Sequence, residues 1–151
     1  MECACGRRHW GLYGAAGLLL VRRDVDGKPL AVVLQHRALW SDQGGTWGVP
    51  GGARMPGETA EDAALREAAE EAGIDRQGVR LRESRVLQHP SWSYTTVIAD
   101  EILPIHPAVT DAESVELRWV PVDEVADLPL LPAFADAWPR LRERIEALGG
   151  R

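Results

Sequence analysis

Residues 52–74, GARMPGETAEDAALREAAEEAGI, hold the strongest local signals in this chain of 151 residues. They predict a helix from Thr59 to Ala72, because Thr59 and Asp62 fit a capping box and Gly73 stands where a left-handed C-terminal cap is favoured. At 100° per residue, one face of this helix is small and apolar. That face is expected to dock closely on a sheet. Its members are Ala64, Leu65, Ala68, Ala69 and Ala72.

The opposite arc of the predicted helix gathers three carboxylates, Glu67, Glu70 and Glu71. Like charges this close repel one another, so they must face water or hold cations between them. A solvated acidic surface is the ordinary interpretation of such an arc. However, a stretch with six glycines, residues 40–57, leads directly into the helix and can bring backbone carbonyls beside the carboxylates. An all-oxygen set of this kind suits Mg²⁺ or Mn²⁺.

The fixed positions of this stretch also carry a family resemblance. The pattern G-x5-E-x7-R-E-U-x-E-E-x-G-U, with U a bulky aliphatic residue, is the box of the Nudix hydrolases. Ala68 stands at the first U position, which reduces packing volume and leaves the polar positions intact. The matching residues are Gly52, Glu58, Arg66, Glu67, Glu70, Glu71, Gly73 and Ile74.

The resemblance implies an α/β (α+β) fold, an α/β/α sandwich with a mixed sheet between helices. It would cover residues 11–148 as a single domain, leaving residues 1–10 as an N-terminal segment outside it. It further implies Mg²⁺-dependent hydrolysis of a nucleoside diphosphate linked to another group, with Mn²⁺ as a possible substitute. The implied metal ligands are Glu67, Glu70, Glu71 and the carbonyl of Gly51.

By the same resemblance, Arg66 corresponds to the cation that orients a carboxylate in the Nudix box. Its guanidinium can hold a neighbouring carboxylate, for which Glu67 is the candidate, by paired charge-assisted hydrogen bonds. Glu58 is expected to reach the metal indirectly or through water. The general base is open between a glutamate of the box and a later one, Glu113 or Glu116, whose ordinary interpretation is surface charge.

Outside the box, Gly11–Arg22 and Leu30–His36 predict a hairpin that turns at Asp26-Gly27. Three later segments predict further strands, and the apolar spacing of Phe134–Leu148 predicts a final helix. Pro139 indicates that this helix is kinked there or begins near Trp138. The three predicted strands are Val79–Leu87, Ser93–Ile102 and Ser114–Val122.

Size and charge exclude several classes of protein. The length fits one domain, and a net charge of -6 gives no general attraction for nucleic-acid polymers or anionic membranes. The apolar stretch Gly11–Val21 is too short to span a bilayer. Two cysteines, Cys3 and Cys5, cannot form a disulfide framework, and with His9 they lack a fourth zinc ligand. We therefore expect a cytoplasmic protein, either a monomer or a homodimer.

The substrate is less clear from the residues. The runs Trp47–Gly52 and Asp127–Pro132 resemble the MutT-type branch, which converts 8-oxo-dGTP to the monophosphate and pyrophosphate. Against it, the founding enzyme of that branch reads the oxidised guanine with an asparagine, and this chain contains none. The alternative is ADP-ribose, suggested by Pro90, and other substrates such as CTP or dinucleoside polyphosphates stay open. A non-catalytic nucleotide-sensing domain is the alternative of a different class.

Two side chains are candidates for substrate binding. Trp47 could stack on a base, and Arg37 could reach a phosphate or a base edge. Core packing is the simpler interpretation for Trp47, and Arg37 could equally be an exposed arginine that aids solubility. Trp40 and Trp92 are weaker candidates for stacking on the same grounds.

Overall fold

The computed structural model describes residues 14–38, 44–88, 93–110 and 114–149. Seven strands, two α-helices and two short 3-10 turns follow one another along this part of the chain. In order, they are β1 (Ala15–Arg23), β2 (Pro29–Arg37), β3 (Trp47–Gly48), β4 (Gly51–Ala53), α1 (Ala60–Ala72), η1 (Arg76–Gly78), β5 (Val79–Gln88), β6 (Ser93–Glu101), β7 (Ser114–Pro121), η2 (Val122–Asp127) and α2 (Pro132–Leu148).

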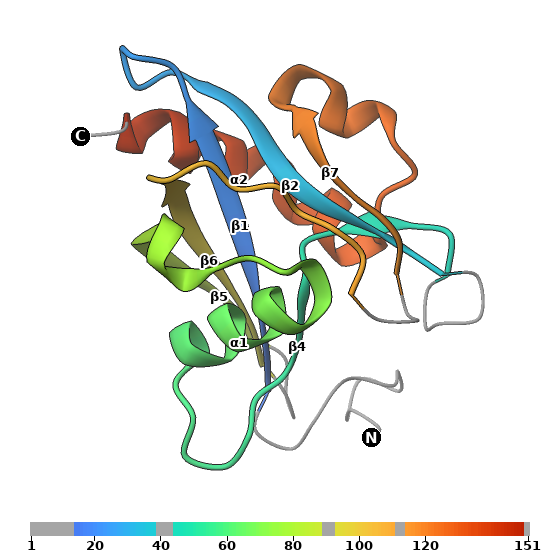
Figure 1. Cartoon of the computed structure of the whole chain (residues 1–151). Helices are drawn as coiled ribbons and strands as arrows, with labels where there is room; N and C mark the ends of the chain where they lie inside the picture. Colours follow the sequence, from blue (N-terminus) through green and yellow to red (C-terminus); the bar gives the residue numbers. More distant parts are fainter. Residues whose placement is uncertain (1–13, 39–43, 89–92, 111–113, 150–151) are drawn as a thin grey trace.

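The strands form a mixed sheet in the order β3-β2-β1-β6-β5, with β4 paired to β1 and β7 paired to β2. Only β1 and β6 run parallel among these pairs, and the two strands match over seven residues from Ala15 and Tyr94 onward. Helix α1 covers one face of the sheet and α2 covers the other, as Figure 1 shows. The predicted α/β/α sandwich is thereby confirmed.

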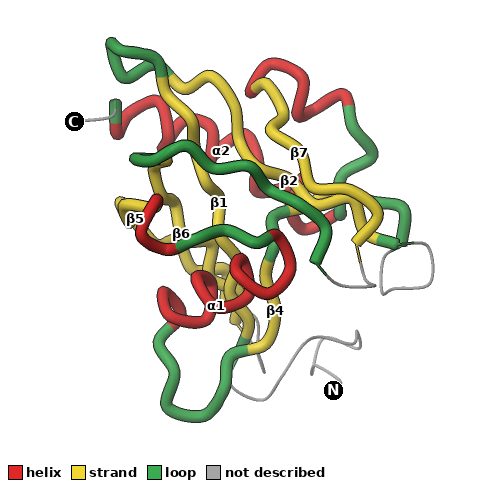
Figure 2. The backbone as a smooth tube through the Cα atoms, in the orientation of Figure 1, coloured by secondary structure: helices red, strands yellow, loops and turns green. Residues whose placement is uncertain are grey.

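The predicted hairpin is present, since β1 and β2 pair antiparallel and Gly27 takes a φ of 87° in the turn between them. Strand β1 is buried on both faces over its first seven residues, which accounts for its nearly continuous apolar sequence. The three later predicted strands correspond to β5, β6 and β7. After β6, the segment 102–110 runs across the α1 side of the sheet (Figure 2), where Ile105 enters the core.

Both predicted caps of α1 are confirmed. The Thr59 hydroxyl accepts a hydrogen bond from the amide of Asp62, and Gly73 has a φ of 67°. The apolar face is buried as predicted except at Ala69, where the prediction is wrong because this residue is exposed at the rim. Ala63 is fully buried in addition. The methyl-sized side chains let α1 lie close to β1 and β4.

Helix α2 begins at Pro132, so the alternative start near Trp138 is wrong. Proline fits the first turn of a helix, where its missing N–H costs nothing, and the chain continues in helical form through Pro139. The predicted apolar positions face the sheet, with Trp138 and Ile145 among the buried residues. No helix in the described ranges is long and apolar enough to cross a membrane.

The C-terminal end of α2 is fixed to the sheet by arginines. Arg23 on β1 donates to the carbonyl of Ile145 over 2.8 Å, and Arg82 on β5 donates to that of Leu148 over 2.9 Å. Both guanidiniums also bind the carboxylate of Asp100 on β6, which is 6% exposed. This buried ion cluster joins three strands to the helix.

Candidate active site

The site is built where the short strand β4 meets α1. The amide of Gly51 donates a hydrogen bond of 2.8 Å to Glu71 Oε1. At Gly52, a Cβ atom would lie 2.6 Å from both Cδ and Oε1 of Glu67, which is closer than real Cβ atoms approach. Glycine at this position therefore lets the Glu67 carboxylate lie directly against the backbone of β4. The structure thus brings two of the three helix carboxylates to the glycine-rich strand.

The three carboxylates differ in exposure. The side chain of Glu70 is 56% exposed, that of Glu67 is 15% exposed, and Glu71 is 5% exposed as a residue. The solvated acidic surface that is the ordinary interpretation of this arc therefore does not describe Glu71, which is buried. This residue lies next to the buried alanines of α1, and the Gly51 amide hydrogen-bonds its carboxylate at that depth.

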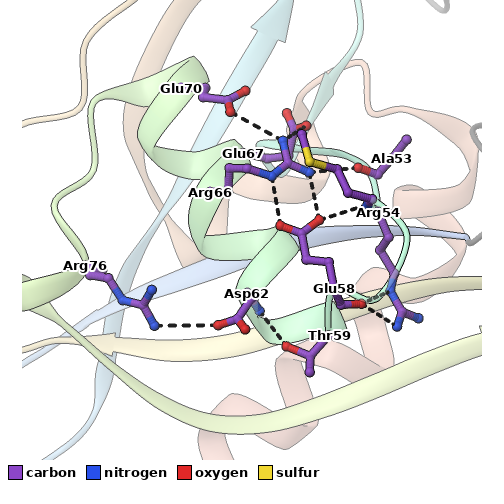
Figure 3. Close-up of polar contacts among 10 residues, drawn as sticks. Ala53, Arg54, Glu58, Thr59, Asp62, Arg66, Glu67, Glu70 and Arg76 are labelled. Carbon is purple, nitrogen blue, oxygen red and sulfur yellow. Dashed lines mark hydrogen bonds and ion pairs between the residues drawn. The ribbon is translucent and has the colours of Figure 1, made fainter.

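Arg66 lies between the acidic side chains, as Figure 3 shows. Its Nε and Nη2 atoms donate to the two oxygens of Glu58 over 2.9 and 3.0 Å. Its Nη1 donates to Glu67 over 2.9 Å and to Glu70 over 3.3 Å, and Nη2 also donates to the carbonyl of Ala53 over 3.0 Å. The paired partner of Arg66 is thus Glu58 and not Glu67, which receives one hydrogen bond from this guanidinium.

The reason for this pairing is the course of the loop before α1. The backbone folds back at Gly57, with a φ of 78°, and the Met55 amide donates to Glu58 Oε1 over 2.9 Å. Arg54 donates twice to the carbonyl of Glu58, over 2.8 and 3.1 Å. The Arg66 guanidinium, together with the Met55 amide, lowers the pKa of Glu58 from 4.5 to about 2. Glu58 in turn raises the pKa of Arg66.

The donor chemistry at β4 and α1 fits a hard divalent cation. Carboxylate oxygens of Glu67 and Glu71 lie beside the backbone of Gly51 and Gly52 with no thiol or imidazole ligand in the set. Within the ranges that the structure describes, no three acidic, histidine or cysteine side chains are grouped closely enough to hold a metal ion as they stand. Glu70, which shares Arg66 Nη1 with Glu67, is the exposed member of the predicted ligand set.

Glu116 is not brought together with the helix carboxylates. It pairs in register with His36, whose ring stacks on Trp47 in the core on the α2 side of the sheet. Its side chain is 47% exposed, and Arg118 lies 3.9 Å away. Several other predicted residues lie outside the described residues, namely Cys3, Cys5, His9, Trp40, Pro90, Trp92 and Glu113.

The two substrate-binding candidates are both buried. Trp47 is 5% exposed, with its ring 4.5 Å from that of His36 and 4.8 Å from the guanidinium carbon of Arg118. Base stacking on this ring would require these neighbours to move. Arg37 is 7% exposed, and its charge lies within electrostatic reach of Tyr94. Both assignments stay predictions.

Tyr94 is a residue near the site that the sequence did not single out. Its hydroxyl occupies the space that side chains would fill at Gly17 and Gly51, 2.2 and 2.9 Å from the two ideal Cβ positions. Burial raises the pKa of Tyr94, and the negative charges of Glu71 and Glu67 raise it further, while Arg37 acts in the opposite sense. The position of Tyr94 depends on pairing between strands far apart in the chain, for which the sequence offers no local signal.

Comparison with known proteins adds the family. The model of the NUDIX domain matches residues 13–143. This chain belongs to the Nudix family. It is 51% identical to a Nudix hydrolase from M. smegmatis, RenU, whose crystal structure superimposes with a TM-score of 0.84 over 94% of this chain and 91% of that one. A C. elegans Ap4A hydrolase, 21% identical with a TM-score of 0.71 over 88% of this chain and 98% of that one, shares the fold.

Two Nudix relatives are also similar in sequence. One is the Mycobacterium tuberculosis protein named "Putative 8-oxo-dGTP diphosphatase 3", 54% identical over 91% of this chain. The other is the Bifidobacterium longum "Nucleoside triphosphate pyrophosphatase/Nudix hydrolase fusion protein", 49% identical over 98% of this chain. The chain spans 65% of the length of the first and 31% of the second.

Proposed function

We propose that this chain is a divalent-metal-dependent pyrophosphohydrolase that converts a nucleoside triphosphate, with 8-oxo-dGTP as the preferred substrate, to the monophosphate and pyrophosphate. The observation that carries the proposal is the contact between α1 and β4. Glu71 accepts a hydrogen bond from the Gly51 amide, and the Glu67 carboxylate lies where any Cβ at Gly52 would stand. A purely solvated acidic surface has no need for either contact.

The charges of the site explain why a metal is required. A polyphosphate is repelled by the acidic face of α1 in a chain whose net charge is already -6. Mg²⁺, when bound, supplies the opposite charge and lowers the pKa of a bound water. In this proposal Glu67, Glu70, Glu71 and the Gly51 carbonyl hold the ion, and Mn²⁺ can replace Mg²⁺.

In the proposal, the paired hydrogen bonds between Arg66 and Glu58 hold the guanidinium in place and do not contact the ion. They fix the guanidinium, which then orients Glu67 through its third donor, Nη1. The pKa of Glu58, about 2, keeps this carboxylate charged throughout the neutral range. Arg66 therefore acts on Glu67 from a fixed position.

The choice of 8-oxo-dGTP rests on the name of the mycobacterial relative, 54% identical to this chain, together with the sequence runs that resemble the MutT-type branch. Because the chain has no asparagine, the base must be read by other groups. A nucleotide substrate of this kind fits a cytoplasmic enzyme.

The test is a competition assay with 8-oxo-dGTP, dGTP, CTP and ADP-ribose at equal concentration with Mg²⁺. We expect the highest kcat/KM for 8-oxo-dGTP, with pyrophosphate as product. A preference for ADP-ribose or CTP would contradict the proposed substrate. Nucleotide binding without turnover of any of the four would contradict the enzyme and favour the sensing domain.

The metal ligands are tested with a charge-matched pair of variants. Glu70→Gln should lower kcat/KM by about a hundredfold or more, because it removes a carboxylate from the proposed ion site. Glu143→Gln removes the same charge from the exposed side of α2 and should leave kcat/KM unchanged. Equal activity in the two variants would contradict the assignment of Glu70.

A further inference from the structure

Two glycines form a gap in the sheet next to the site. Gly17 on β1 and Gly51 on β4 are direct partners in the strand register. Neither has a side chain to cover the sheet there, and glycine pairs weaken a sheet unless a neighbouring aromatic ring covers them. The gap therefore needs a group from another strand.

Tyr94 fills this gap from the far side of β1. It is the second residue of β6, pairs in register with Ala15, and extends past Gly17 toward β4. Its hydroxyl lies 2.2 Å from the ideal Cβ position of Gly17 and 2.9 Å from that of Gly51. A single side chain of β6 thus contacts both β1 and β4.

Strand β4 depends on such support because it is short. It has three residues, and β1 is the strand with which it pairs, over Ala15–Gly17. Successive residues of β4 point to opposite faces, so Gly51 faces Tyr94 while Gly52 faces Glu67 on α1. Tyr94 and the helix carboxylates therefore contact β4 from opposite sides.

We propose that Tyr94 is a positioning residue, which holds the Gly51 peptide from the side opposite α1 so that Glu71 and Glu67 keep their places against β4. The effect on the metal rests on the proposed function, whereas the effect on the Gly51 amide does not. Since the Gly51 amide donates to Glu71, its hydrogen exchange reports directly on this contact.

The experiment compares Tyr94→Leu with Trp119→Leu. Trp119 is a half-buried aromatic residue on β7, which pairs with β2, and its indole N–H donates to the carbonyl of Ile105. Its loss destabilises the protein without touching β4. Exchange of the Gly51 amide is measured by NMR relative to that of Val97, a fully buried residue of β6 that reports global opening.

For Tyr94→Leu we expect exchange of the Gly51 amide to accelerate about tenfold relative to Val97, since local support is lost while the global fold stays. Affinity for Mn²⁺ alone, measured by electron paramagnetic resonance, should fall about tenfold, as for other groups that orient metal ligands. Trp119→Leu should change neither the exchange of the Gly51 amide relative to Val97 nor the affinity for Mn²⁺. Tyr94→Phe removes only the hydroxyl that lies against Gly17 and Gly51, so it should accelerate exchange at Gly51 in the same direction but by less than Tyr94→Leu.

Unchanged relative exchange at Gly51 in Tyr94→Leu, or the same acceleration in Trp119→Leu, would overturn the proposal. Faster exchange with full Mn²⁺ affinity would overturn the link between Tyr94 and the metal. Absence of Mn²⁺ binding in the wild-type protein would overturn the proposed function, while the exchange data would still decide the role of Tyr94. If Tyr94→Leu does not fold, Tyr94→Met, which keeps more volume, undergoes the same comparison.

Discussion

Replacing Gly52 by alanine should disturb the candidate site while leaving the fold intact, and it removes no carboxylate. The new Cβ would lie 2.6 Å from Cδ and Oε1 of Glu67 and 2.8 Å from Oε2. Because the obstructing atoms are the far end of a flexible side chain, β4 can stay in place while the Glu67 carboxylate moves. It must move by about 0.8 Å to reach an ordinary contact distance of 3.4 Å.

The expected cost is small for stability and large for function. Moving Glu67 weakens its hydrogen bond with Arg66, a partly exposed ion pair worth at most about 1 kcal/mol. In a protein of this size, that corresponds to a decrease in Tm of about 2–4 °C. A displacement approaching 1 Å at Glu67, a metal ligand in the proposed function, should lower Mn²⁺ affinity and kcat/KM by about ten- to a hundredfold. The functional loss then equals about 1.4–2.7 kcal/mol.

The matched control is Gly48→Ala. Its Cβ would lie 3.6 Å from Leu131 Cβ, an ordinary contact, so this glycine tolerates the added methyl group. Calorimetric titration with Mn²⁺, steady-state kinetics and thermal unfolding are measured on both variants. Wild-type Mn²⁺ affinity and turnover in Gly52→Ala would refute the reasoning, and so would an equal loss of function in Gly48→Ala.

Three further predictions concern charged groups. Glu71→Gln keeps an acceptor for the Gly51 amide but loses the charge. In steady-state kinetics kcat/KM should fall about a hundredfold or more. In denaturant unfolding the free energy of unfolding should change by less than about 1 kcal/mol. Glu58→Gln should be less stable than wild type at pH 7. This difference should shrink as the pH falls through about 2, because the folded pKa lies below the unfolded value of 4.5; urea titrations between pH 7 and pH 2 test the sign. Asp100→Asn leaves Arg23 buried without its carboxylate and should cost about 3–5 kcal/mol in urea unfolding, with Mn²⁺ affinity of the folded protein unchanged.

The features that the sequence predicted well depend on neighbours in the chain. The caps at Thr59 and Gly73 and the turn at Gly27 each involve residues within a few positions of one another. Their local chemistry is sufficient to specify them. The apolar spacing of α2 is local in the same sense, and its buried residues agree with the prediction.

The features that the sequence missed depend on how distant elements dock. The burial of Glu71 and the exposure of Ala69 follow from how far α1 is rotated against β4, which helical periodicity alone does not specify. The motif spacing showed that Glu58 and Arg66 belong together in the box but not that they pair, because the pairing requires the loop to fold back at Gly57. The role of Tyr94 requires the order β4-β1-β6.

The helix carboxylates are buried to different degrees, so they are held in place with different strength. Glu71 is buried and tied to the Gly51 backbone, so it cannot move without disturbing β4. Glu70 is exposed and held by one long contact with Arg66, a partner whose strongest hydrogen bonds already go to Glu58. An exposed ion pair of this kind contributes little free energy, so Glu70 can leave Arg66 at small cost when a cation competes for it. In the proposed ion site, one buried and one weakly held carboxylate would allow an ion to bind and leave without repacking the core.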